Sequence, residues 1–159
     1  MNVNIICIGK LKEKYLKDAE TEYAKRLSRF CKLKITELSE APLAENYSDA
    51  EKNIALKKEA EMISAALKGA DVIVSLCVEG KQKSSEDFAD FISKKMIEGK
   101  SNFAFVIGSS CGLSETVKKM SHLRLSFSEM TFPHQLMRII LLEQIYRGFK
   151  INANEKYHK

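Results

Sequence analysis

The sequence predicts an α/β protein in which a mostly parallel sheet carries helices on both faces. Apolar, strand-like runs alternate along the chain with segments of helical spacing, an order typical of parallel sheets. Residues 71–78 and 103–107 are apolar almost without interruption, which indicates strands covered on both faces. The 159 residues, of which 45% are apolar and 30% charged, fit a single domain over residues 1–159.

The first strand and helix are the clearest of the amino-terminal elements. Residues 3–8 are mainly apolar and stop at Gly9, so they predict a short buried strand. In residues 11 to about 30, apolar side chains recur every three or four positions while Lys, Glu and Arg fill the other face, which predicts a helix. A second strand is predicted over residues 33–38.

The middle of the chain repeats this pattern. Ser48 is a suitable N-cap for a helix that extends to about Lys68, where Gly69 can end it. The apolar strand 71–78 follows, and a third helix is predicted over residues 84 to about 98.

The carboxyl-terminal part adds two strands and two helices. The apolar strand 103–107 ends at Gly108, and a short helix begins near residue 114. A last strand is predicted over residues 123–127, and Pro133 opens a long helix because proline fits the first helical turn.

The long last helix is more apolar than the core of one chain requires. Apolar side chains between residues 136 and 149 cover well over half of its circumference. One apolar stripe is enough for a helix on the surface of a monomer. The extra width predicts a subunit interface in a homodimer, although complete burial within one chain is the alternative.

Charge is distributed unevenly along the chain. Residues 1–34 carry a net charge of +5, residues 35–120 a net −3 and residues 121–159 a net +3. If the two basic ends meet in space, they form a surface that can bind a phosphate backbone through counterion release. Solvated helix faces are the alternative interpretation.

Cysteine, histidine and hydropathy patterns exclude several classes of protein. The four cysteines form no C-x-x-C pair and the three histidines are scattered, so no metal site is predicted. Cys7, Cys77 and Cys111 lie in or beside apolar runs and are predicted to be buried free thiols. No apolar run approaches the ~20 residues of a membrane span, and no signal-like start is present, so we expect a cytoplasmic protein with no membrane partner.

Three loops are the predicted ligand site. Parallel α/β sheets bind ligands outside the carboxyl ends of their strands. The loops at these ends cover residues 76–80, 108–112 and 127–134. The last of them combines aromatic, hydroxyl and imidazole groups just before a helix, which suits a flat heterocycle held by backbone groups between apolar walls.

Several ordered motifs give the chain a resemblance to a known family. They are Gly9-Lys10-Leu11-Lys12, Phe105-Val106-Ile107-Gly108, Gly112-Leu113, residues 125–135 (LSFSEMTFPHQ), Glu143-Gln144-Ile145-Tyr146-Arg147 and Tyr157-His158-Lys159. Together they resemble the SPOUT methyltransferases over essentially the whole chain. Within that class they are most similar to the RlmH family, which methylates N3 of a pseudouridine in large-subunit (23S) ribosomal RNA.

The resemblance implies a fold, a cofactor and partners. It implies a trefoil knot in the carboxyl-terminal half, a homodimer that acts on the assembled ribosome, and S-adenosylmethionine as methyl donor. By position, the implied cofactor-binding residues are Leu76, Gly108, Phe127, Ser128, Glu129, Met130, Thr131 and Phe132.

Two positions depart from the pattern of the family. Where the family often has a second glycine, this chain has Ser109, which would be strained if the backbone φ were positive there. Where the family often has an acidic residue, this chain has Cys77.

The implied reaction gives three catalytic candidates. N3 of pseudouridine must lose a proton, and His158 is the predicted base or relay. The alternative is that no residue acts as base and that positioning of the RNA suffices. Arg147 is predicted to stabilise negative charge on the neighbouring carbonyl oxygens, and Tyr157 to stack on the base or donate to it. The predicted RNA contacts are Lys10, Lys12, Arg138, Lys150 and Lys159.

Two other functions stay open on the sequence alone. A small α/β enzyme acting on a free nucleotide would share the sheet order and the small-residue turn after Gly108. A ribosome-associated protein without catalytic activity would account for the departures at Cys77 and Ser109.

Overall fold

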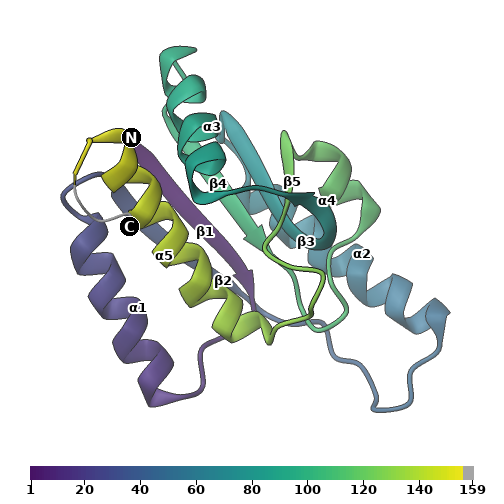
Figure 1. Ribbon diagram of the computed structural model, residues 1–159. Coiled ribbons are helices and arrows are strands. Elements are labelled where there is room, and N and C mark those ends of the chain that lie inside the picture. Colours follow the sequence, from purple (N-terminus) through teal and green to yellow (C-terminus); the bar gives the residue numbers. More distant parts are fainter. Residues whose placement is uncertain (156–159) are drawn as a thin grey trace.

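The computed structural model describes residues 1–155 and forms a five-stranded sheet with five helices in that range (Figure 1). The elements in order are β1 (Asn2–Ile8), α1 (Lys14–Leu27), β2 (Lys32–Leu38), α2 (Asp49–Ala66), β3 (Val72–Gln82), α3 (Ser85–Ile97), β4 (Asn102–Ile107), α4 (Glu115–Met120), β5 (Leu123–Ser126) and α5 (His134–Asn152). Strands and helices alternate throughout, as the sequence predicts.

All strand pairs are parallel, and the strand order is β2-β1-β4-β3-β5. β1 therefore lies between β2 and β4, with Asn2 opposite Lys32 on one side and Asn102 on the other. This arrangement confirms the predicted parallel α/β fold. The trefoil knot that the resemblance implies stays a prediction.

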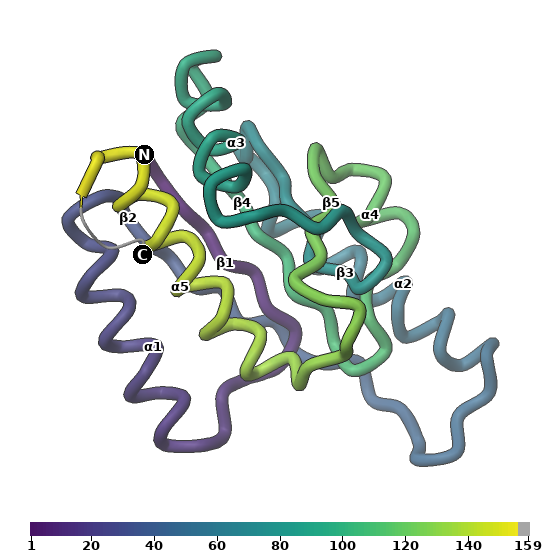
Figure 2. Tube along the Cα trace, viewed as in Figure 1, coloured from purple at the N-terminus to yellow at the C-terminus, as the bar shows by residue number. Residues whose placement is uncertain are grey.

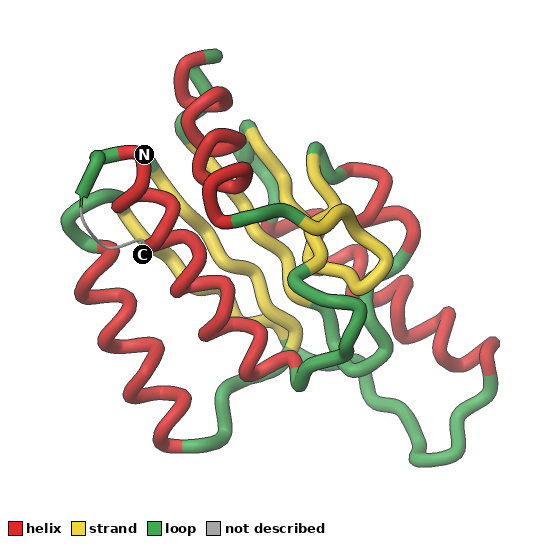
Figure 3. Tube along the Cα trace, viewed as in Figure 1, coloured by secondary structure: helices red, strands yellow, loops and turns green. Residues whose placement is uncertain are grey.

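The helices form one layer on each face of the sheet. Alternate residues of β1 enter different cores: Ile5 packs with α1, α3 and α5, while Ile6 packs with α2 and α4. Figure 3 shows α1, α3 and α5 on the near face of the strands. Apolar side chains on both faces of the central strands explain why their sequences are continuous rather than alternating.

Serine caps fix the starts of three helices. The hydroxyls of Ser48, Ser84 and Ser114 accept hydrogen bonds from the backbone N–H groups of Glu51, Asp87 and Val117. At Ser48 the Glu51 carboxylate also accepts from the Ser48 backbone N–H, which completes a capping box.

The third strand is longer than predicted. β3 extends to Gln82, and Leu125 of β5 is opposite both Leu76 and Lys81 of β3, so the residues between them bulge. A Cβ at Gly80 would lie 2.8 Å from the backbone of Arg124, so only glycine allows this close approach. The bulge projects from the carboxyl edge of the sheet, where the predicted ligand loops lie.

Within residues 1–155, no helix is both long enough and apolar enough to cross a membrane.

Candidate functional site

A cavity of about 670 Å³ lies at the carboxyl edge of the sheet. Its walls come from the bulged part of β3 and from the segments that follow β4 and β5. Figure 2 shows that these three parts of the backbone, far apart in sequence, meet at one end of the sheet. Its volume is within the range of small-molecule sites in proteins. The structure thus brings together the three segments that the sequence predicts as the ligand site, although residues 76–80 are the bulged part of β3 and not a loop.

Most of the predicted cofactor-binding residues line this cavity. They are Leu76, Gly108, Phe127, Ser128, Met130, Thr131 and Phe132. Glu129 is exposed and is not among the lining residues, so the structure does not bring it to the cavity.

The turn after β4 depends on glycine at its first position. A Cβ at Gly108 would overlap the carbonyl oxygen of Gly112, so the two backbone segments can approach only without a side chain. The Gly112 N–H donates to the Ser109 carbonyl at 2.9 Å and closes the turn.

Ser109 does not strain this turn. Among the described residues, Asn154 alone has a positive φ without being glycine. Ser109 therefore adopts an ordinary backbone conformation, and the positive φ of the turn falls on Gly112 at 83°. The strain considered for Ser109 does not occur.

Serine side chains order the loop after β5. The Ser126 hydroxyl donates to the Ser128 carbonyl at 2.9 Å, and the Ser128 hydroxyl accepts from the Met130 N–H at 3.0 Å. These bonds hold a segment without regular structure against the cavity, with the Phe127 and Phe132 side chains half-buried beside it.

An ion pair at the cavity was missed by the sequence analysis. The Lys118 ammonium on α4 pairs with Glu79 of the bulge, and also with Glu115 at 3.0 Å. Burial would lower the pKa of Lys118, but its bonds to the two carboxylates outweigh burial and raise it. The bond from Lys118 lowers the pKa of Glu79. The Glu79 and Lys118 side chains both line the cavity and stay charged at neutral pH.

Two cysteines also line the cavity. Cys7 is buried as predicted, but Cys77 and Cys111 are only half-buried, so the prediction of complete burial is wrong for these two. Cys77 lies in the bulge of β3, and Cys111 lies in the turn after β4. Partial burial raises the pKa of the Cys77 thiol. No group of His, Cys, Asp or Glu within residues 1–155 is arranged to hold a metal ion.

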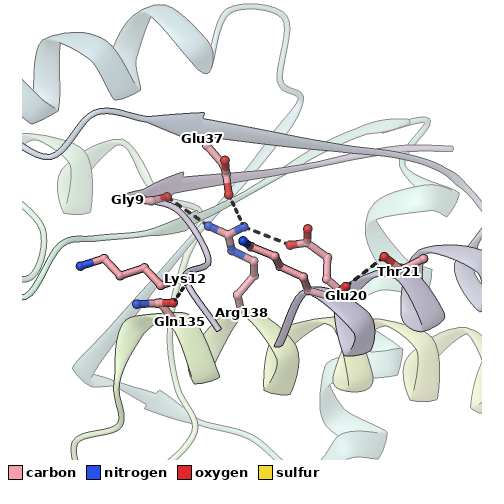
Figure 4. Close-up of polar contacts among 8 residues, drawn as sticks. Gly9, Lys12, Glu20, Thr21, Glu37, Gln135 and Arg138 are labelled. Carbon is pink, nitrogen blue, oxygen red and sulfur yellow. Dashed lines mark hydrogen bonds and ion pairs between the residues drawn. The ribbon is translucent and has the colours of Figure 1, made fainter. Parts of the chain in front are cut away.

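The start of α5 connects the cavity to the loop after β1. His134 lines the cavity, and a Cβ at Gly9 would lie 3.6 Å from its Nε2 atom. The neighbouring Gln135 side-chain oxygen accepts a hydrogen bond from the Lys12 N–H at 2.8 Å (Figure 4). Lys10 and Lys12 are both exposed, so two cations flank this side of the cavity.

Arg138 was wrongly predicted to contact RNA. Its side chain is 3% exposed and its Nη1 atom pairs with Glu37 at 2.7 Å and with Glu20 at 3.0 Å. Its Nη2 atom donates to the Gly9 carbonyl at 3.1 Å (Figure 4). Arg138 lies on the apolar face of α5, where only a paired charge is stable. Its contacts join α5 to α1, to β2 and to the residue after β1.

Arg147 and Lys150 are separate from this cavity. Arg147 lies on α5, 13 residues beyond His134 and therefore about 20 Å along the helix, and it pairs with Glu143 at 2.7 Å. Lys150 is largely buried and pairs with Glu155, so it offers little to a phosphate. Tyr157, His158 and Lys159 lie outside the described residues.

Solved structures of other proteins share the fold of this chain. A solved structure described as a "Probable Methyltransferase" from Bordetella pertussis Tohama I covers 92% of this chain and 93% of its own, with a TM-score of 0.59 at 11% identity. A putative methylase family protein from Neisseria gonorrhoeae matches with a TM-score of 0.54 at 14% identity, over 91% of this chain and 81% of its own. The chain thus has a parallel α/β fold shared with proteins described as methyltransferases.

Sequence comparison gives the particular family. The family described as "Predicted SPOUT methyltransferase" matches residues 1–158, and the chain belongs to this family. It is 54% identical to "Ribosomal RNA large subunit methyltransferase H" of Clostridium novyi (strain NT) and 53% identical to the protein of that name from Bacillus cytotoxicus. Both alignments cover 100% of both chains. The resemblance read from the motifs is confirmed.

Proposed function

We propose that this chain is an S-adenosylmethionine-dependent methyltransferase that modifies N3 of a pseudouridine in 23S ribosomal RNA. It acts as one SPOUT domain over residues 1–159, in the cytoplasm, as a homodimer on the assembled ribosome. The observation that carries the proposal is the convergence of the β3 bulge and the segments after β4 and β5 on one cavity. The names of the full-length relatives point to ribosomal RNA of the large subunit as the substrate.

The cavity fits S-adenosylmethionine in size and chemistry. Its volume of about 670 Å³ is sufficient for a nucleoside with an amino-acid side chain. Leu76, Leu113 and Phe127 provide apolar surface for a flat base, and the close turn at Gly108 exposes backbone groups to it. Glu79 and Lys118 provide one charge of each sign for polar groups of the ligand.

When bound, S-adenosylmethionine supplies an electrophilic methyl group on a positively charged sulfur. The residues of the chain have three tasks around it. The β3 bulge and the loops after β4 and β5 fix the position of the donor, and such positioning lowers the barrier of a two-reactant step by up to roughly 7–11 kcal/mol. The exposed Lys10 and Lys12 bind phosphates of the RNA beside the cavity.

The third task is removal of the N3 proton. His158 accepts this proton as base or relay, Arg147 stabilises the charge that develops on the adjacent carbonyl oxygens, and Tyr157 stacks on the base. Arg147 is about 15 Å along α5 from Met137, which also lines the cavity of its own chain, so we propose that it serves the cavity of a second copy.

The outward face of α5 supports this dimer. Leu136, Ile140, Glu143 and Arg147 share one side of the helix by their spacing, and Leu136 is 39% exposed. The opposite side packs against the sheet through Leu141, Leu142 and Ile145, which are fully buried. The outward face of α5 thus combines apolar and charged side chains, including Arg147, and such a face is suited to contact a second copy of the chain.

The proposal is tested by methyl incorporation. Purified protein is incubated with labelled S-adenosylmethionine and with ribosomes that lack the modification, and the product is located by the stop that a methyl group on a base-pairing edge causes in reverse transcription. We expect one stop, at a pseudouridine of 23S RNA. Labelling of free nucleosides instead of ribosomes would favour the small-molecule enzyme, and absence of donor binding in calorimetry would favour the non-catalytic protein.

The catalytic residues and the dimer need separate measurements. His158→Ala is expected to reduce turnover much more than donor binding, and unchanged turnover would refute the role of His158. Sedimentation at working concentration is expected to give a dimer, whereas a monomer would contradict the role given to Arg147.

A further inference from the structure

A buried carboxylate lies directly behind the cavity. Glu59 of α2 is 3% exposed, although glutamate is almost never fully buried without partners. It does not line the cavity and takes no part in the three tasks of methyl transfer. Its position therefore requires an explanation from its contacts.

Each oxygen of Glu59 binds a different loop. Oε2 accepts a hydrogen bond from the Ser109 hydroxyl at 2.9 Å, and Oε1 accepts from the Ala41 N–H at 3.1 Å. Ser109 is 8% exposed and belongs to the turn that lines the cavity. One carboxylate thus connects the cavity turn to the segment before α2.

The next two residues of the turn contact the same segment. The Ser110 hydroxyl donates to Glu40 at 3.3 Å, and the Cys111 thiol lies 3.7 Å from the Tyr47 hydroxyl. These contacts are exposed, and exposed polar contacts contribute little alone. The bond from Ser109 to Glu59 is the buried one of the set, so it is the contact that most restricts the turn.

We propose that Glu59 is a positioning residue that acts through Ser109 to hold the Gly108–Gly112 turn in the shape that binds the methyl donor. The inference rests on the proposed function, because it concerns the affinity of that cavity. It also gives Ser109 a role: where the resemblance predicts a glycine, this chain has a hydroxyl that holds the turn to α2.

The test separates positioning from chemistry by comparing the affinity for S-adenosylmethionine, measured as the dissociation constant in calorimetry and as KM, with kcat. Glu59→Met keeps most of the side-chain volume but loses both acceptors. We expect about a tenfold rise in KM, the effect of losing roughly one buried hydrogen bond, with kcat nearly unchanged. Glu59→Gln keeps an acceptor for Ala41 and a polar partner for Ser109, so it is expected to restore KM to within about twofold of wild type.

Three further variants make the test specific. Ser109→Ala removes only one hydroxyl and is expected to raise KM in the same way even if Glu59→Met does not fold. Adding Ser109→Ala to Glu59→Met is expected to raise KM no further, because the two residues act as one unit. Glu61→Met removes the same charge from the exposed side of α2 and serves as the matched control.

The outcomes distinguish this inference from the proposed function. If wild type binds S-adenosylmethionine but Ser109→Ala and Glu59→Met leave KM unchanged, or lower kcat alone, the positioning role is wrong and the function stands. If wild type does not bind the donor in calorimetry, the proposed function is wrong and the inference is lost with it.

Discussion

The Nη1 atom of Arg138 lies 2.7 Å from the Oε1 atom of Glu37, in a pair that joins α5 to the end of β2. The guanidinium is buried, while Glu37 keeps 32% of its side-chain surface exposed. A second carboxylate, Glu20 of α1, shares the same nitrogen at 3.0 Å. A buried cation with two carboxylates is costly to leave incomplete, because each charge has lost hydration.

Arg138→Met is therefore expected to lower the free energy of unfolding by about 2–3 kcal/mol. This is less than the 3–5 kcal/mol typical of a fully buried pair, because water still reaches Glu20 and Glu37. Urea denaturation at neutral pH measures the loss. A matched change at an exposed cation of α1, Lys17→Met, is expected to stay within about 0.5 kcal/mol of wild type. Equal stability of the two variants would show that the Arg138 pair does not hold α5.

Gly108→Ala is expected to abolish or strongly weaken binding of S-adenosylmethionine. The added methyl group would overlap the Gly112 carbonyl, so the turn has to open at a cost of about 1–3 kcal/mol. Calorimetry measures the affinity. The control is Gly148→Ala on α5, whose added carbon would lie at ordinary contact distance, 3.6 Å from Ile92. That variant is expected to bind normally, and equally weakened binding in both variants would show that the turn does not control the affinity.

Salt dependence tests the RNA surface. Replacing both Lys10 and Lys12 by Ala is expected to reduce the slope of log affinity against log salt by about 1–2, since each phosphate contact contributes about 0.7–0.9. Filter binding of a 23S RNA fragment at several salt concentrations provides the slope. The pair Lys57→Ala and Lys58→Ala, exposed on α2 in the opposite layer, is the control. A slope that changes equally in both double variants would place the RNA elsewhere.

Glu59 is expected to give stability a distinctive pH dependence. Burial raises its pKa above the ordinary value of 4.5, and the neighbouring Glu40 carboxylate raises it further, against the bonds from Ala41 and Ser109. The folded state then binds the proton more tightly than the unfolded chain. The contribution of Glu59 to the free energy of unfolding is thus full below about pH 4.5 and declines as pH rises through the folded pKa.

Glu59→Gln removes the pH-dependent contribution of residue 59 to the free energy of unfolding, because the amide does not titrate. The stability of the variant relative to wild type is expected to increase from pH 4 towards pH 7, as urea denaturation at each pH would show. Taking the difference cancels the other titrating groups. A relative stability that is flat or falls with pH would mean that burial does not control this carboxylate.

The elements of the fold could be predicted from the sequence because their signals are local. The strand 103–107 and the serine at the start of α2 depend on neighbouring residues only, and both agree with the structure. The end of β3 could not be predicted in this way. Residues 79–82 are polar and contain Gly80, and their pairing depends on the backbone of β5, some 40 residues away in sequence.

The site could be predicted as loops but not as contacts. Strand ends indicated where the cavity lies, whereas the pair between Lys118 and Glu79 required knowledge of how α4 packs. Arg138 carried a signal that charge counting ignored: it shares a helix face with Leu141, Leu142 and Ile145. A cation on an apolar face indicates a buried ion pair. Counting Arg138 with the other basic residues of the chain ends led instead to the prediction of an RNA contact.

The position of β1 between β2 and β4 has a consequence for the nascent chain. β1 leaves the ribosome before the other strands of the sheet, yet one of its two edges stays without a partner until residue 107 has been synthesised, since Asn2 is opposite Asn102 and Cys7 is opposite Ile107. Contacts so distant in sequence form slowly, and an open apolar strand is prone to aggregate. Translation that stalls before β4 emerges would thus leave a fragment that needs a chaperone.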